Sequence, residues 1–145
     1  MIDKQKIESL FKELDTYLKE VKQLSLLSEV EYLTNVRNIY SGRYLLQISI
    51  ETCINIGNHI ISREALGIPK DYADTFRILQ SNNIISTSLL ERLILMTRFR
   101  NRIVHLYWDI DDKLVLEIIK NNYGDFINYR TEILEHLKKN QSKDR

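Results

Sequence analysis

The residues best suited to chemistry gather in one segment, which runs from Arg98 to Trp108 and reads RFRNRIVHLYW. A histidine takes up or releases a proton near neutral pH, and an arginine holds phosphate with a rigid fork of N–H donors. RNA supplies its own nucleophile, the 2′-hydroxyl, so a histidine and an arginine are close to a minimal set for cleaving RNA without a metal. DNA lacks that hydroxyl and should resist the same chemistry.

Helical spacing limits which of these side chains can act together. His105 follows Asn101 by four residues, so the two share one face of a helix. Arg98 and Arg102 lie near that face. Arg100 precedes His105 by five residues, which separates the two by about 140° on a straight helix. From spacing alone, Arg100 therefore ranks below its neighbours, unless the helix end unwinds or two chains share one cleft.

Motifs for other chemistries are missing from the sequence. It has no H-E-x-x-H motif, no Cys/His cluster, no paired acidic motif and no glycine-rich phosphate loop. We therefore expect neither a metal nor a cofactor. The formal net charge of +1 gives the whole chain little attraction for phosphate. Any RNA binding must come from a local patch, for which Arg98 and Arg102 are the candidates.

Few chain breakers and a regular apolar spacing predict an all-α fold. The chain has one proline and four glycines in 145 residues. Apolar residues recur at helical spacing from Ile7 to Leu24, which predicts a first helix with Asp3 as its N-cap. The second helix is expected from Ser28 to about Ser62, with a Ser28–Glu31 capping box and a bend near Gly42. A short helix over 71–80 should bury Tyr72, Phe76 and Leu79. A fourth helix is expected from Ser86 or Ser88 (the latter with a Ser88–Glu91 capping box) through Trp108, and a last helix from about Val115 to Leu137. Together they form an antiparallel helical bundle of about five helices.

The organisation of the chain is that of one domain, which we place at residues 1–138, followed by a polar tail at 139–145. The first residues are charged, without the apolar core of a signal peptide, and no apolar run reaches the length of a membrane span. We therefore expect a cytoplasmic protein that does not contact a membrane. The only cysteine, Cys53, has apolar neighbours and is expected to be buried in the core.

The segment from Arg100 to Tyr107 resembles the R-x4-H-x-Y signature of HepT-like HEPN proteins. The family's arginine is followed by a polar residue, often asparagine, as Arg100 is by Asn101. The flanking segments RYLLQISIETCINIGNHII, IPKDYADTFRIL, IISTSLLERLILMTRFRN and YWDID resemble family segments in the same order. The resemblance extends from about residue 3 to 137, which makes the short motif specific.

The resemblance implies a HEPN-type bundle that acts as the toxin ribonuclease of a type VII-like toxin–antitoxin system. It implies a homodimer, in which a second chain completes the cleft and removes the angular problem at Arg100. Arg100 and His105 would be the catalytic pair, and Asn101 would position phosphate or His105. A nucleotidyltransferase antitoxin of the MntA kind would AMPylate Tyr107, and the added bulk and charge would block RNA.

Two other interpretations stay open at this point. The chain could be a non-catalytic RNA- or nucleotide-binding HEPN module that scaffolds a nucleotidyltransferase. It could also be a plain helical interaction protein whose arginine-rich helix is a solvated surface. Growth arrest that depends on His105 favours the ribonuclease, and RNA or nucleotide binding without cleavage favours the binding module. The absence of both effects favours the interaction protein.

Overall fold

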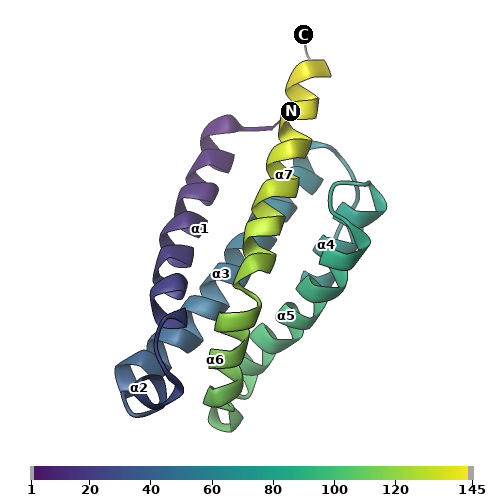
Figure 1. The fold of residues 1–145 in the computed structure, drawn as a ribbon. Helices are drawn as coiled ribbons and strands as arrows, with labels where there is room; N and C mark the ends of the chain where they lie inside the picture. The colour runs from purple at the N-terminus through teal and green to yellow at the C-terminus, as the bar shows by residue number, and fades with distance from the viewer. Residues whose placement is uncertain (1, 144–145) are drawn as a thin grey trace.

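The chain folds into a bundle of α-helices (Figure 1). The structure, a computed structural model, describes residues 2–143, with side chains up to residue 141. The helices within this range are α1 Lys4–Ser25, α2 Glu29–Leu33, α3 Val36–Arg63, α4 Tyr72–Ser81, α5 Thr87–His105, a 3-10 turn η1 at Tyr107–Asp109, α6 Asp112–Asn121 and α7 Tyr123–Lys143. The predicted all-α class is confirmed, whereas the count of about five helices is too low for two reasons.

The first reason is a break that separates α2 from α3. The predicted Ser28–Glu31 capping box is present at the start of α2. However, the helix ends at Leu33, and the Asn35 side chain then accepts the Arg37 N–H at 3.0 Å and caps a new helix. Helix α3 continues through Gly42 without a break. Gly42 instead gives the buried Tyr32 ring room against α3, because a Cβ at this position would overlap the Tyr32 hydroxyl.

The second reason is a break in the predicted last helix at Asn122. This residue ends α6, and its side-chain amide donates to the Asp125 carboxylate at 2.9 Å in the first turn of α7. α7 then continues to Lys143, past the predicted domain end at residue 138. The division of the chain at that position stays a prediction, and residues 144 and 145 of the predicted tail lie outside the described residues.

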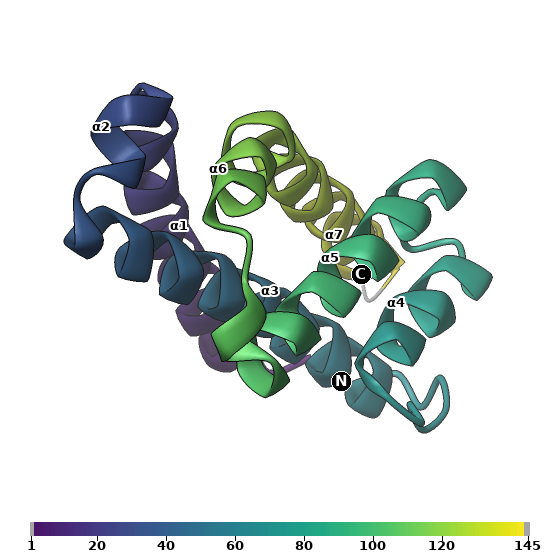
Figure 2. The same ribbon diagram turned by 90° about the horizontal axis from the view of Figure 1, so that it is seen from below.

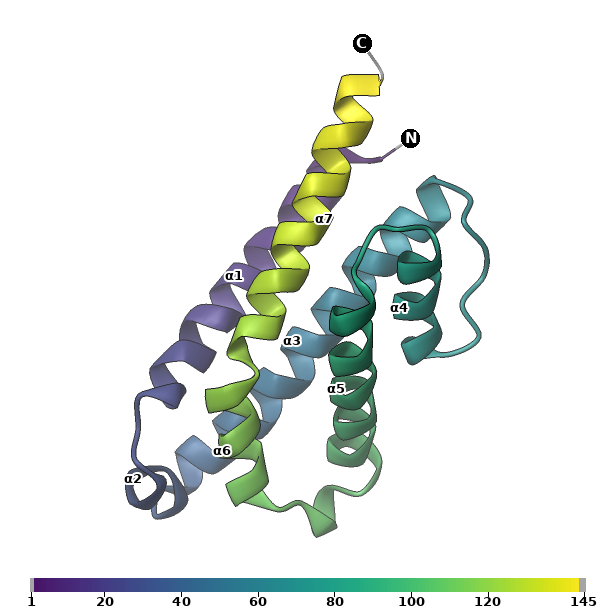
Figure 3. The same ribbon diagram turned by 45° about the vertical axis from the view of Figure 1, so that its right-hand side comes forward.

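Helix α3 is the central element of the bundle. It lies between α1 on one side and the α4–α5 pair on the other, and α6 also contacts it (Figures 2 and 3). Its apolar residues fill the core, as its sequence predicts. Cys53 is buried as expected, and its carbonyl accepts the Tyr129 hydroxyl of α7 at 2.8 Å. Burial raises the pKa of the Cys53 thiol, so the thiol stays protonated.

The path of the chain after α3 determines which segments lie next to α5. After α3 ends, the 64–71 segment descends beside it to the start of α4, and α5 then runs antiparallel to α4 (Figure 3). The start of α4 and the C-terminal half of α5 therefore lie on the same side of α3. No helix among residues 2–143 has the length and apolarity that crossing a membrane requires.

Candidate active site at the end of helix α5

The amphipathic sequence of α5 fixes which side chains reach solvent. Ser86 is its N-cap and accepts the Leu89 N–H at 3.3 Å, so the alternative start with a Ser88–Glu91 capping box is wrong. The inner face of the helix is buried and consists of Leu89, Leu93, Met96, Thr97, Phe99 and Ile103. With that face in the core, Arg98, Asn101, Arg102 and His105 are exposed.

Arg100 differs from the other arginines of this segment because α3 and α4 hold it in place. Its Nε and Nη2 donate to Glu51 Oε1 of α3 at 2.9 and 2.5 Å. Its guanidinium carbon lies 4.8 Å from the centre of the Tyr72 ring, at the start of α4. Only 11% of the Arg100 side chain is exposed. This combination of ion pair and cation–π contact fixes the plane of the guanidinium.

Neighbouring polar groups complete the support of Arg100. Gln47 lies one turn before Glu51 on α3 and donates to the same Oε1 at 3.2 Å. Asn101 Oδ1 accepts from Arg100 Nη1 at 3.1 Å. Each terminal nitrogen carries two N–H groups, so one donor on Nη1 and one on Nη2 remain after these bonds. These two donors are available to phosphate oxygens.

His105 is exposed and is the last residue of α5. Helical backbone ends at Leu106, at φ −126° and ψ 40°, so the helix unwinds only beyond His105. Arg100 and His105 are therefore both on regular helix, and the angle of about 140° between them holds within one chain. Asn101, which spacing groups with His105, is bonded to Arg100 instead.

The segment after α5 presents two large aromatic side chains to solvent. Tyr107 and Trp108 are 64% and 70% exposed, and their rings meet edge to face with centroids 5.3 Å apart. The Tyr107 carbonyl accepts from Arg43 Nη1 of α3 at 3.4 Å. Arg43 also forms two 2.7 Å bonds to the Asp112 carboxylate of α6. The turn is thus anchored by its backbone, which leaves the Tyr107 ring accessible.

The supporting residues Glu51, Gln47 and Tyr72 were missed by sequence reasoning. A glutamine and a glutamate four residues apart on an otherwise apolar helix were a usable signal, because a charge on such a helix needs a partner. Tyr72 was expected on the buried face of its helix with Phe76 and Leu79. Those two are fully buried, but Tyr72 is 45% exposed, because its ring covers Arg100 instead of entering the core.

The remaining histidines lie outside this site. His136 of α7 lies with Nε2 at 2.8 Å from Glu64 Oε2, next to the end of α3. His59 Nε2 accepts the Asp3 N–H at 3.3 Å and so ties the start of the chain to α3. Among the residues that the structure describes, no group of three or more His, Cys, Asp or Glu side chains could hold a metal ion.

The helical bundle has the fold of the HEPN class. The sequence matches the family described as Ribonuclease HepT-like over residues 14–133, and the chain belongs to this family. The predicted family and enzyme class, a ribonuclease, are thereby confirmed.

Named relatives agree with this assignment. The mRNA nuclease HepT of Shewanella oneidensis is 37% identical over 81 residues, which are 56% of this chain and 61% of the relative, less than two thirds of its length. The tRNA nuclease HepT of Aphanizomenon flos-aquae is 27% identical over 131 residues, 90% of this chain and 89% of the relative. A solved structure of the tri-AMPylated Shewanella oneidensis HEPN toxin in complex with MNT antitoxin matches with a TM-score of 0.82 and 27% identity, over 89% of this chain and 96% of that one.

Proposed function

We propose that the chain is a metal-independent endoribonuclease, the toxin of a type VII-like toxin–antitoxin pair, with Arg100 and His105 as catalytic residues. The observation that carries the proposal is the rigid support of Arg100 by Glu51, Asn101 and Tyr72, on the helix that ends with the exposed His105. A preorganised arginine stabilises the charge that grows on phosphorus in the transition state without reorganising. An unsupported surface arginine would have to lose side-chain entropy first.

The reaction conserves atoms and charge without a co-reactant. The 2′-oxygen of one nucleotide attacks the adjacent phosphorus, the O2′–P bond forms and the P–O5′ bond breaks. The products are a 2′,3′-cyclic phosphate and a 5′-hydroxyl. The proton of the 2′-hydroxyl leaves and a proton reaches the 5′-oxygen, and His105 serves one of these transfers. Arg100 offers its two remaining donors to the phosphate oxygens, and Arg98 and Arg102 attract the backbone of the RNA.

A homodimer supplies the second half of the site in this proposal. Within one chain the straight helix points Arg100 and His105 in different directions, and a second copy can place its own His105 or Arg100 in the same cleft. Large aromatic side chains are exposed near this end of α5 and on the first turns of α3. They are Tyr40, Tyr44, Tyr107 and Trp108. Such side chains are enriched at protein interfaces.

The ribonuclease proposal is tested with purified protein, made without an antitoxin and incubated with total RNA in excess chelator. We expect discrete fragments with cyclic-phosphate ends. Arg100→Ala and His105→Ala should each lower the rate by at least about 100-fold, the scale for removing a transition-state donor or a general acid–base. Arg37→Ala, at the exposed start of α3, is the matched control and should cleave normally. Cleavage that persists in both active-site variants would contradict the assignment.

Inhibition would come from a nucleotidyltransferase antitoxin of the MntA kind that AMPylates Tyr107. The similar Shewanella toxin is AMPylated in complex with its antitoxin, and Tyr107 is accessible beside the proposed site. After co-expression with the cognate nucleotidyltransferase, intact mass should show added AMP, lost in Tyr107→Phe. That variant should arrest growth even with the antitoxin present. Tyr44→Phe, also an exposed tyrosine, should be modified and silenced; loss of the adduct in Tyr44→Phe alone would refute the choice of residue.

The second candidate function is a non-catalytic RNA- or nucleotide-binding partner of a nucleotidyltransferase. The same supported Arg100 would then hold a phosphate without cleaving its ester. Unmodified protein that binds RNA but leaves it intact in the assay above would favour this function.

A further inference from the structure

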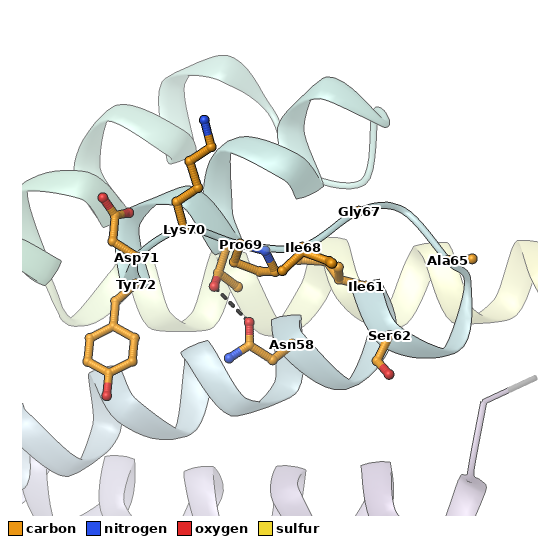
Figure 4. Close-up of a pocket in the computed structure, with 11 residues that line it drawn as sticks. Asn58, Ile61, Ser62, Ala65, Gly67, Ile68, Pro69, Lys70, Asp71 and Tyr72 are labelled. Carbon is orange, nitrogen blue, oxygen red and sulfur yellow. Dashed lines mark hydrogen bonds between the residues drawn. The ribbon is translucent and has the colours of Figure 1, made fainter.

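A pocket of about 540 Å³ lies beside the site, between the last turns of α3, the 64–71 segment and the start of α4 (Figure 4). Its size is in the range of pockets that hold small organic ligands. Apolar side chains form part of the wall, among them Ile61, Ile68 and Pro69. Residues with polar side chains also line it, among them Asn58, Ser62 and Tyr72. An apolar wall with a few placed polar groups suits a nucleobase.

Tyr72 connects this pocket to the proposed active site. Its ring lies 4.8 Å from the guanidinium carbon of Arg100, and the same residue lines the pocket. A nucleotide in the pocket and a phosphate on Arg100 would therefore both contact the Tyr72 side chain, as neighbouring parts of one RNA chain.

Asn58 is the group best placed to contact a base. The Thr75 hydroxyl donates to Asn58 Oδ1 at 2.7 Å, which fixes the amide. Figure 4 shows the amide nitrogen on the side of Tyr72. Among the described residues, that nitrogen has no acceptor, so both its N–H groups are available to a ligand. A fixed amide donor in a pocket selects ligands with a carbonyl or ring-nitrogen acceptor, which all RNA bases carry.

Side chains of both signs lie at the rim of the pocket. The carboxylates of Asp71 and Asp74 lie 3.7 and 3.9 Å from Arg77 Nη1, and Lys70 adds a second positive charge. Lys70 extends from the rim, away from Asn58 (Figure 4). At this place, the Lys70 ammonium would contact a phosphate next to a base in the pocket.

We propose that this pocket binds one ribonucleotide of the RNA substrate, with the base against Asn58 and Tyr72, and so selects the sequence that is cut. The proposal rests on the proposed function, since it places the pocket next to the phosphate that Arg100 holds. In this proposal the end of α3 and the start of α4 recognise the base, whereas Arg98 and Arg102 contact only the RNA backbone.

Binding is tested first, without RNA cleavage. The four ribonucleoside 3′-monophosphates are titrated into the intact protein and followed by backbone amide NMR. We expect shifts within residues 58–75, with at least one base preferred. Ser62→Phe, which fills the pocket from its exposed edge, should weaken binding about tenfold, the scale of one lost base contact. Shifts confined to other segments, or undiminished in Ser62→Phe, would overturn the proposal.

Selection is tested by sequencing the ends of the fragments from total RNA. Asn58→Asp keeps the acceptor for Thr75 but replaces the amide donors by a charged oxygen. It should therefore change which nucleotide flanks the cut. Asn128→Asp, on the exposed side of α7, carries the same charge change and should leave the preference unaltered. An unaltered preference in Asn58→Asp, with normal rates, would also overturn the proposal. If nucleotides shift the amide signals of residues 58–75 but the protein cuts no RNA, the ribonuclease function is refuted and the pocket is supported as a nucleotide-binding site.

Discussion

Arg100 shows how one side chain is prepared for a function before any ligand arrives. Glu51 takes one edge of its guanidinium, Asn101 bonds Nη1, and Tyr72 covers a face. The long side chain loses its conformational entropy during folding, so phosphate binding does not have to order it. Glu51 therefore acts as a positioning residue in the proposed reaction, whereas Arg98 and Arg102 are exposed and adaptable.

Replacing Glu51 tests this view at the scale of one residue. Glu51→Gln keeps the shape but removes the charge-assisted bond, which is worth ~1.5 kcal/mol. We expect kcat for RNA cleavage to fall about tenfold with little change in KM, because the substrate still meets the same guanidinium. Glu117→Gln, on the exposed side of α6, should match the wild type. A kcat that rises in Glu51→Gln would mean that Glu51 restrains Arg100 instead of positioning it.

Helix α3 is the element on which the site depends. It carries Glu51 and Gln47 toward Arg100, Asn58 toward α4, and Arg43 toward the turn after α5. Its contact with α4 is close at Gly57. A Cβ there would lie 2.7 Å from Thr75 Cγ2 and 3.1 Å from the Tyr129 hydroxyl. The glycine therefore sets how near α4, and with it Tyr72, approaches α3.

A methyl group at Gly57 tests this element. Gly57→Ala forces α4 and α7 outward, at a cost of ~1–3 kcal/mol, partly offset by up to ~1 kcal/mol of better helix propensity. For a net loss of ~1–2 kcal/mol, the middle of that range, thermal denaturation should show a Tm lower by roughly 2–8 °C, at ~2–4 °C per kcal/mol for a domain of this size. Gly124→Ala on α7 is the control, because nothing lies within 4 Å of its added Cβ. An unchanged or higher Tm in Gly57→Ala would contradict the close packing.

At the scale of the whole molecule, polar contacts connect helices that are far apart in the sequence. Arg130 of α7 bonds to both carboxylate oxygens of Asp15 in α1, at 2.8 and 3.0 Å. His59 of α3 accepts the N–H of Asp3, just before α1. Burial, and then the positive charge of Arg63, lowers the pKa of His59, so the folded state favours its neutral form.

This lowered pKa makes a prediction about stability and pH. An unfolded histidine titrates near ~6.5. Because the folded value is lower, the unfolded state binds more protons. The contribution of His59 is then fully present above that pH and is lost as the pH falls through the folded pKa. Urea unfolding should show a smaller wild-type advantage over His59→Gln at about pH 5 than at about pH 7.5. An advantage that grows on acidification would contradict the assigned sign.

The sequence by itself determined the helical class, most helix starts and the segment that carries the chemistry. Helical periodicity and N-caps are local properties, so the residue types and spacing alone identify Asp3, Ser28 and Ser86 as caps or cap candidates. The breaks at Asn35 and Asn122 were missed, because an asparagine inside a periodic apolar pattern ends a helix only when its side chain finds a local backbone or carboxylate partner.

Only the tertiary structure decided which arginine of the segment is held. Spacing along α5 ranked Arg98 and Arg102 with His105, and the family motif pointed to Arg100. The decisive contacts come from Glu51 and Tyr72, which lie 49 and 28 positions earlier in the chain. Periodicity reports the environment of one helix, whereas an ion pair between helices depends on how α3, α4 and α5 are placed side by side. That placement follows from packing of the whole core, including the close contact at Gly57, and no local pattern encodes it.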